Sequence, residues 1–242
     1  MENQTNNPMN PYSFDSSYAN QGLTLNRYMS KTFGWMFLGL LVTFAVAWGM
    51  AASNAVLYLF YTVPQITIIL LIAEVAVVLI FSARIHKNSV GTSRVLFLFY
   101  SLLNGVVFSV YFVVFDVASL IAIFGLTALF FGGFALYGRF TKTDLSRLRP
   151  LLIGGLIFLV VASLLSLLID MSAMERLICM AGIVIFLCFT AYDTQKIKAN
   201  YQYFQQDAAM LQRASIYAAL ELYLDFINLF LYLLRFLGRN RN

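Results

Sequence analysis

The sequence predicts an all-α polytopic membrane protein, folded as a seven-transmembrane helical bundle. Of its 242 residues, 61% are hydrophobic and only 11% are charged, and the mean hydropathy is +0.79. A soluble domain carries about a quarter charged residues. This chain lacks the polar surface that would cover a water-exposed globule, so we expect its solvent to be the lipid bilayer. The net charge of +5 resides in short loops that set topology, so it does not predict nucleic-acid binding.

Five runs are long enough for a helix of about 20 residues to cross the hydrocarbon core. They cover residues 32–52, 64–83, 95–115, 117–138 and 151–169, and the only charged residue among them is Glu74. A sixth run, 177–192, is uncharged but has only sixteen residues. We therefore expect this helix to draw part of a turn beyond Tyr192 into the membrane region.

The seventh candidate span, residues 214–234, contains Glu221, Asp225 and Asn228. Its 21 residues make a complete crossing, so we favour a full span. The alternative is a segment that re-enters the membrane and returns to the side from which it came.

The ends of the chain differ from its middle. Residues 1–30 include six asparagines, Pro8 and Pro11, and lack the apolar core of a cleavable signal peptide. We expect them to form a disordered cytoplasmic tail. Residues 31–238 then form the membrane domain, and residues 239–242 form a short basic tail.

The loops between the spans are short, so their basic residues report orientation. Twelve of the sixteen lysines and arginines fall on the side of the N-terminus, and only Arg176 falls in the opposite loops. The positive-inside rule therefore predicts a cytoplasmic N-terminus. The other three, Arg235, Arg239 and Arg241, follow the last span and would lie outside if it crosses fully.

Ionisable residues within spans are the informative ones, because each costs at least ~2.5 kcal/mol at the centre of the membrane. Glu74 and Asp225 fall near the midplane, and Asp193 directly follows the sixth run, near the inner interface. Glu221 lies one turn before Asp225 on the same helix face. Asp193 could be an interfacial acid, and Glu74 could be a structural hydrogen-bonding group. An ionised Asp225 would be unpaired, so we expect it to be protonated or to share a proton with another carboxyl group.

The residue inventory does not favour an enzyme. The only histidine, His86, lies in a basic loop, so an intramembrane Ser-His dyad has no base. All five lysines fall in predicted loops, which excludes a retinal-type Schiff base. Tyr192 and Asp193 match the first half of a presenilin-type protease signature, but the Gly-x-Gly-Asp half is absent. Cys179 and Cys188 support neither a disulfide framework nor a metal-ligand cluster, and we expect no cofactor.

Two segments carry a family resemblance. Residues 191–198 read AYDTQKIK and residues 219–236 read ALELYLDFINLFLYLLRF; a weaker match is IAEVA at residues 72–76. With these segments the sequence resembles the Bax inhibitor-1 family, also called the transmembrane Bax inhibitor motif proteins. The span number and the basic loops agree from about residue 25 to residue 237.

The resemblance implies a central last helix wrapped by the other six, and a pH-sensitive calcium leak channel of bacterial type. In such a channel Asp193 and Asp225 would share a proton, control opening and contact passing calcium ions. Glu74, with Glu221, would lie on the ion path. Arg84 would be the latch, an arginine that holds the aspartate pair. It stands one residue closer to Glu74 than the family pattern has it, so His86 and Lys87 are alternatives.

The leading hypothesis is therefore a calcium leak channel that contributes to calcium homeostasis and stress protection. Its expected partners are the lipid bilayer, calcium as the permeant ion and other membrane proteins. The alternative is a membrane adaptor without transport activity that regulates, or is handled by, membrane proteases and other membrane proteins. It would use the N-terminal tail and a cytoplasmic loop extended by a polar insertion at residues 201–208. Compact loops favour a bacterial plasma (inner) membrane.

Overall fold

The computed structural model describes residues 24–84, 87–166, 168 and 173–238. The predicted tail up to residue 23, His86 and the basic residues 239–242 lie outside this part of the chain. The described residues form helices and no β-strand, and seven helices are long and apolar enough to cross a membrane. The predicted fold class, an all-α polytopic membrane protein with seven transmembrane helices, is confirmed.

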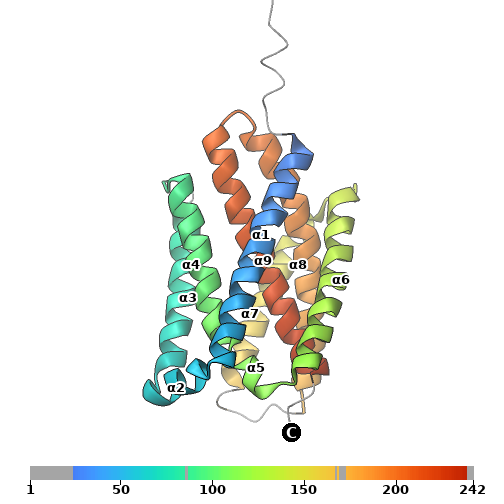
Figure 1. Cartoon of the computed structure of the whole chain (residues 1–242). Coiled ribbons are helices and arrows are strands. Elements are labelled where there is room, and N and C mark those ends of the chain that lie inside the picture. Colours follow the sequence, from blue (N-terminus) through green and yellow to red (C-terminus); the bar gives the residue numbers. More distant parts are fainter. Residues whose placement is uncertain (1–23, 85–86, 167, 169–172, 239–242) are drawn as a thin grey trace, which may run out of the picture.

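The spanning helices are α1 (Leu25–Ala52), α3 (Ile66–Ala83), α4 (Val90–Phe108), α6 (Val117–Phe140), α7 (Arg149–Leu165), α8 (Glu175–Phe204) and α9 (Ala208–Leu237). Three short elements accompany them: α2 (Ala55–Thr62), α5 (Tyr111–Val114) and the 3₁₀ turn η1 (Leu145–Leu148). Helix α2 joins α1 to α3, α5 extends α4, and η1 leads into α7. Successive spans run in opposite directions, as short connections require (Figure 1).

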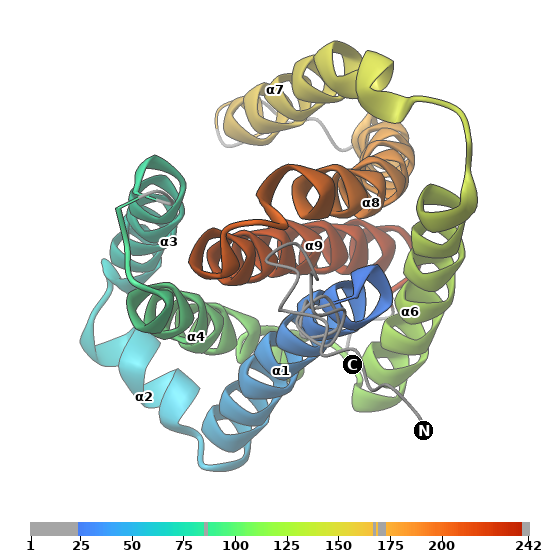
Figure 2. The ribbon, with the colours of Figure 1, turned by 90° about the horizontal axis from the view of Figure 1, so that it is seen from above.

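Helix α9 occupies the centre of the bundle, as predicted (Figure 2). In its most apolar stretch 67% of the residues are buried, against 17–44% in the other spans. It packs most extensively on α8 and then on α1, α6 and α4. A helix that is apolar on every side needs such a position in a water-soluble fold. In a bilayer the outer helices can instead expose their apolar faces to lipid. Helix α9 carries the acidic residues Glu221 and Asp225, which are costly in lipid, and this explains its central position.

Helix α1 begins earlier than the sequence predicted. The Thr24 side chain caps it by accepting the N–H of Arg27. Residues 25–30, assigned above to the tail, are helical, and Tyr28 and Met29 are buried in the bundle. Their burial explains why the helix starts within a segment of polar composition.

The extended loop predicted after the sixth span is wrong. Helix α8 continues beyond Tyr192 to Phe204, and only residues 205–207 connect it to α9. Three of its polar residues, Gln195, Lys196 and Lys198, have hydrogen-bond partners on other elements of the bundle. Because those charges and amides are paired, this part of the chain can be helical and packed. It also follows that Lys31, Lys196 and Lys198 are helical, not loop, residues.

Candidate functional site

The centre of the α8–α9 hairpin holds the two aspartates. Asp193 is the nineteenth of 30 residues in α8, and Asp225 is the eighteenth of 30 in α9. They are only 8% and 4% exposed, and their carboxyl groups lie within hydrogen-bonding reach of each other. A hydrogen bond between two carboxyl groups needs a proton on one of them, because two ionised groups this close repel each other. The geometry is therefore that of a proton-sharing pair.

The expected difference in depth between the two aspartates is absent. Asp193 lies well inside α8, because this helix continues for eleven residues beyond it. The two helices are antiparallel neighbours, so residues three or four positions apart on each lie on one face. Lys196 lies one turn after Asp193 on α8, and Glu221 lies one turn before Asp225 on α9. Because the helices are antiparallel, Lys196 and Glu221 therefore lie at the same level of the hairpin.

Lys196 and Glu221 form an ion pair beside the aspartates. The Nζ atom of Lys196 lies 2.6 Å from Oε1 of Glu221 and 4.0 Å from Oδ1 of Asp193. The ammonium group also lies 5.8 Å from the ring centroid of Tyr217. The Lys196 and Glu221 side chains are 32% and 18% exposed. We call Asp193, Lys196, Glu221 and Asp225 the hairpin cluster.

Lys196 is the residue of this cluster that the sequence reasoning missed. It was assigned to a loop because the apolar run ends at Tyr192. The signal that could have found it is its spacing: Lys196 follows Asp193 by three residues, and Glu221 precedes Asp225 by four. In two antiparallel helices that meet at the aspartates, this spacing brings the opposite charges together.

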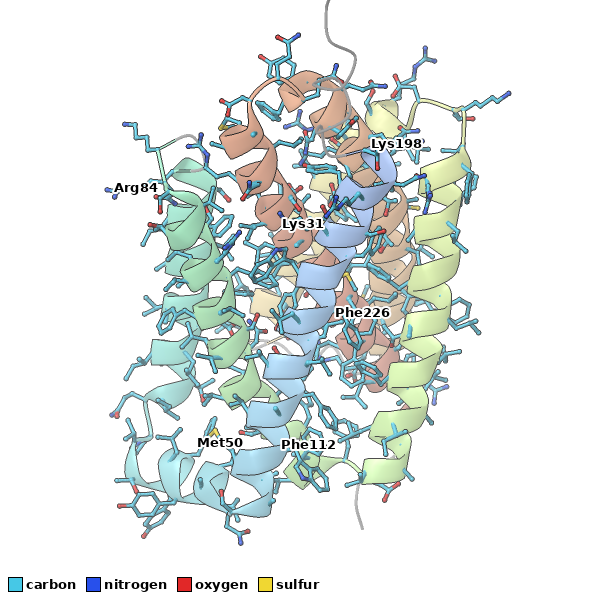
Figure 3. All side chains as sticks on the ribbon, turned by 45° about the horizontal axis from the view of Figure 1, so that its top comes forward. Lys31, Met50, Arg84, Phe112, Lys198 and Phe226 are labelled. Atoms are coloured by element: carbon cyan, nitrogen blue, oxygen red, sulfur yellow. The ribbon has the colours of Figure 1, made fainter. Side chains whose placement is uncertain are left out.

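Arg84, the expected latch, lies away from the aspartates. It caps the C-terminal end of α3 and is exposed, at the edge of the bundle in Figure 3. Among the described residues, no hydrogen bond or ion pair joins it to Asp193 or Asp225. Lys87 is also exposed, and His86 lies outside the described residues.

Glu74 lies in a second, mainly apolar cavity. This cavity has a volume of about 380 Å³, and its walls come from α2, α3, α4 and α5. Its Oε1 atom is buried and has no hydrogen-bond partner in the described structure. Among the described residues, no ion pair joins Glu74 to the hairpin cluster. Glu74 and Glu221, assigned together to an ion path, therefore belong to separate clusters.

The remaining polar residues of 191–198 hold α8 against its neighbours. Gln195 accepts the N–H of Leu145 and donates to the carbonyl of Thr143, so it fixes the loop between α6 and η1. Lys198 donates to the carbonyl of Arg139 at the end of α6. The segment thus supplies the hairpin cluster and anchors the helices around it.

Metal ligands are sparse in the described part of the chain. No group of three or more His, Cys, Asp or Glu side chains is placed to hold a metal ion there. Calcium takes six to eight oxygen ligands, so Asp193 and Asp225 could contribute only part of a coordination shell to a passing ion. Both cysteines are free thiols on α8, and Cys179 is buried.

The amino-acid sequence of the chain is similar to those of known membrane proteins. Residues 25–242 match the family model described as "Inhibitor of apoptosis-promoting Bax1". The chain is 44% identical over 218 residues to the inner membrane protein YbhL of Escherichia coli, covering 90% of this chain and 93% of that protein. It is 37% identical over 220 residues to an uncharacterised protein of Borreliella burgdorferi, covering 91% and 95%. An uncharacterised membrane protein of Streptococcus pyogenes is 32% identical over 225 residues, covering 92% and 97%.

Proposed function

The chain belongs to the Bax inhibitor-1 family, and from that premise we propose that it is a pH-sensitive leak channel for calcium and other cations, opened and closed by Asp193 and Asp225. The observation that carries the proposal is the buried pair of carboxyl groups, within hydrogen-bonding reach of each other, between α8 and the central helix. Charged groups are costly within a membrane-spanning bundle, and they mark ion pathways and proton relays in membrane proteins. We assign the protein no enzymatic activity.

The shared proton would control the contact between the two helices. With the proton in place, the hydrogen bond joins α8 to α9. When pH rises and the proton is lost, two negative charges stand side by side. At about 4 Å and effective dielectrics of 20 to 80, their repulsion is on the order of 1 to 4 kcal/mol. This is enough to shift a balance between closed and open states, so the channel should open at neutral to alkaline pH.

The location of the channel follows from a relative and from charge. YbhL is named as an inner membrane protein, which supports the same location for this chain. The positive-inside rule supports a cytoplasmic N-terminus. The basic residues Arg27, Lys31, Arg139 and Lys142 lie at the end of the bundle where α1 begins and α6 ends. A regulated leak there would contribute to calcium homeostasis and to protection under stress.

Calcium flux into liposomes tests the proposal. The purified chain is reconstituted with a calcium dye inside, and flux is measured between pH 6 and 8. We expect flux to rise with pH in the wild-type protein. In Asp225→Asn the pair cannot accumulate two negative charges, so the pH dependence should be lost.

Glu175→Gln is the matched control, because it makes the same chemical change at an exposed residue of α8. It should behave as the wild-type protein does. Absence of wild-type flux across this pH range, or an Asp225→Asn variant with unchanged pH dependence, would show that the proposal is wrong.

A further inference from the structure

The hairpin cluster contains one cation between two acidic partners at unequal distances. The Nζ atom of Lys196 contacts Glu221 at 2.6 Å and stands 4.0 Å from Asp193. Lys196 and Asp193 are one helical turn apart on α8, so a rotation of the lysine side chain alone can exchange one partner for the other. The lysine is thus within reach of the pair but is held mainly by Glu221.

In the described part of the chain, Asp193 forms an ion pair with Lys196. The ring of Tyr217 lies beside the cluster, with its centroid 5.8 Å from Nζ of Lys196, and its hydroxyl lies 3.5 Å from the Ser82 hydroxyl of α3. No ion pair joins either aspartate to a titratable residue of the other described elements packed on the hairpin: Arg27, Tyr28 and Lys31 of α1, Arg94 and Tyr100 of α4, Tyr137 and Arg139 of α6, Arg147 of η1 and Arg149 of α7. For example, Arg139 donates to Asn26, and Arg94 lies over the ring of Trp35. Because Lys196 lies near both Asp193 and Glu221, it is placed to respond to the charge of the pair.

We propose that Lys196 sets the pH at which the aspartate pair opens the channel, by moving from Glu221 towards Asp193 when the shared proton is lost. The step rests on the leak-channel function proposed above. The proton passes to water, the pair gains one negative charge, and the ammonium group neutralises part of it. Glu221 opposes this movement, because it competes for the same cation and adds a negative charge of its own. Lys196 and Glu221 therefore influence the pair in opposite directions.

Opposite shifts in the pH midpoint of calcium flux would reveal this arrangement. Lys196→Gln removes the charge that favours the ionised pair, so the midpoint should move to higher pH. Glu221→Gln removes the competing acid, so the midpoint should move to lower pH. Each shift should be about one pH unit, the order expected for a unit charge about 4 Å away. Lys196→Arg keeps the charge and should stay near the wild-type midpoint.

A purely structural ion pair gives a different result. If the Lys196–Glu221 contact only holds α8 against α9, both glutamine variants break it and shift the midpoint in the same direction. That result, or no shift in either variant, overturns the role of Lys196 while leaving the leak-channel function intact. Loss of wild-type flux, or unchanged pH dependence in Asp225→Asn, instead overturns the function itself.

Controls separate charge from folding. Lys142→Gln and Glu175→Gln make the same changes at exposed residues and should leave the midpoint unchanged. A monodisperse gel-filtration profile identifies folded variants. If Lys196→Gln does not fold, Glu221→Gln still tests the proposal, because a shift to higher pH or no shift there contradicts it.

Discussion

Polar side chains on the central helix find partners on the helices around it. The Ser215 hydroxyl lies 2.9 Å from that of Thr32 in α1. The Tyr223 hydroxyl donates to Thr43, since Thr43 itself donates to the carbonyl of Ser101 in α4. In the hydrocarbon region no bulk water is present to form hydrogen bonds with such groups, so these contacts fix the position and rotation of α9 relative to α1.

Two buried polar atoms beside the proposed gate differ from this pattern. Asp225 Oδ2 and Thr194 Oγ1 have no hydrogen-bond partner among the described residues. A buried polar atom without a partner costs about 1 to 3 kcal/mol. Such a cost at the carboxyl pair is expected where a group serves ion passage and not only packing.

Gly138 sets the distance between α6 and the segment that carries Asp193. A Cβ atom there would overlap the backbone carbonyl of Ala191, which cannot move as a side chain can. Gly138→Ala should therefore destabilise the protein by about 1 to 3 kcal/mol and lower its melting temperature in detergent.

Gly133→Ala is the matched control on the same helix, because nothing lies within 4 Å of the added Cβ atom. It should leave stability unchanged or raise it by about 0.5 to 1 kcal/mol, since alanine favours the helix. Equal melting temperatures for the two variants would show that the close contact of α6 with α8 does not limit stability.

The α8–α9 hairpin depends on a connection of three residues. Its last residue, Asp207, caps α9 by accepting the N–H of Met210 at 2.9 Å. Asp207→Ala should lower the free energy of unfolding by about 1 kcal/mol, the usual cost of losing an N-cap. Urea unfolding in mild detergent measures this.

Asp207→Asn retains an oxygen acceptor and should keep most of the stability. If the alanine and asparagine variants unfold alike, the cap does not stabilise the start of α9.

The centres of the spans could be predicted from sequence, and the ends of the last two could not. Lipid requires an apolar outer face on each peripheral helix, and this requirement appears directly in the composition of the runs. Lys196 and Glu221 interrupt the apolar pattern when each helix is considered alone. Only the pairing of α8 with α9 shows that these charges neutralise each other within the bundle. The cost of acids within spans points to Asp193 and Asp225, and the family resemblance implies Arg84, whereas the position of Lys196 beside the pair becomes clear only when α8 and α9 are paired.

The bundle as a whole is packed unevenly around its central helix. On one side α8 covers α9 closely. On another, a groove of about 560 Å³ opens between α1 and α6, and its walls include Phe226, Ile227 and Phe230 of α9. Phe226 directly follows Asp225, so the central helix has space beside the point where charge repulsion would act. Figure 3 shows Phe226 between α1 and α6 in the interior of the bundle.

Cysteine labelling tests the orientation of the whole molecule. Ser53 and Gln205 are exposed at opposite ends of the bundle, after α1 and after α8. In a background with Cys179→Ala and Cys188→Ala, a membrane-impermeant maleimide should label Ser53→Cys only from outside the cell and Gln205→Cys only from the cytoplasmic side. Labelling of Gln205→Cys in intact cells would contradict the cytoplasmic N-terminus.

A reporter fused to the C-terminus tests the last crossing. Helix α9 is continuous for 30 residues and ends on the opposite side of the bundle from the start of α1 (Figure 1). With seven spans and a cytoplasmic N-terminus, the reporter should lie outside. The basic residue Arg235 at that end favours the cytoplasm, but six preceding helices have already fixed the topology. Alkaline phosphatase fused there should be active and green fluorescent protein should be dark. The reverse result would mean that α9 does not cross, and it would remove the membrane-central position of Asp225 on which the proposed gate depends.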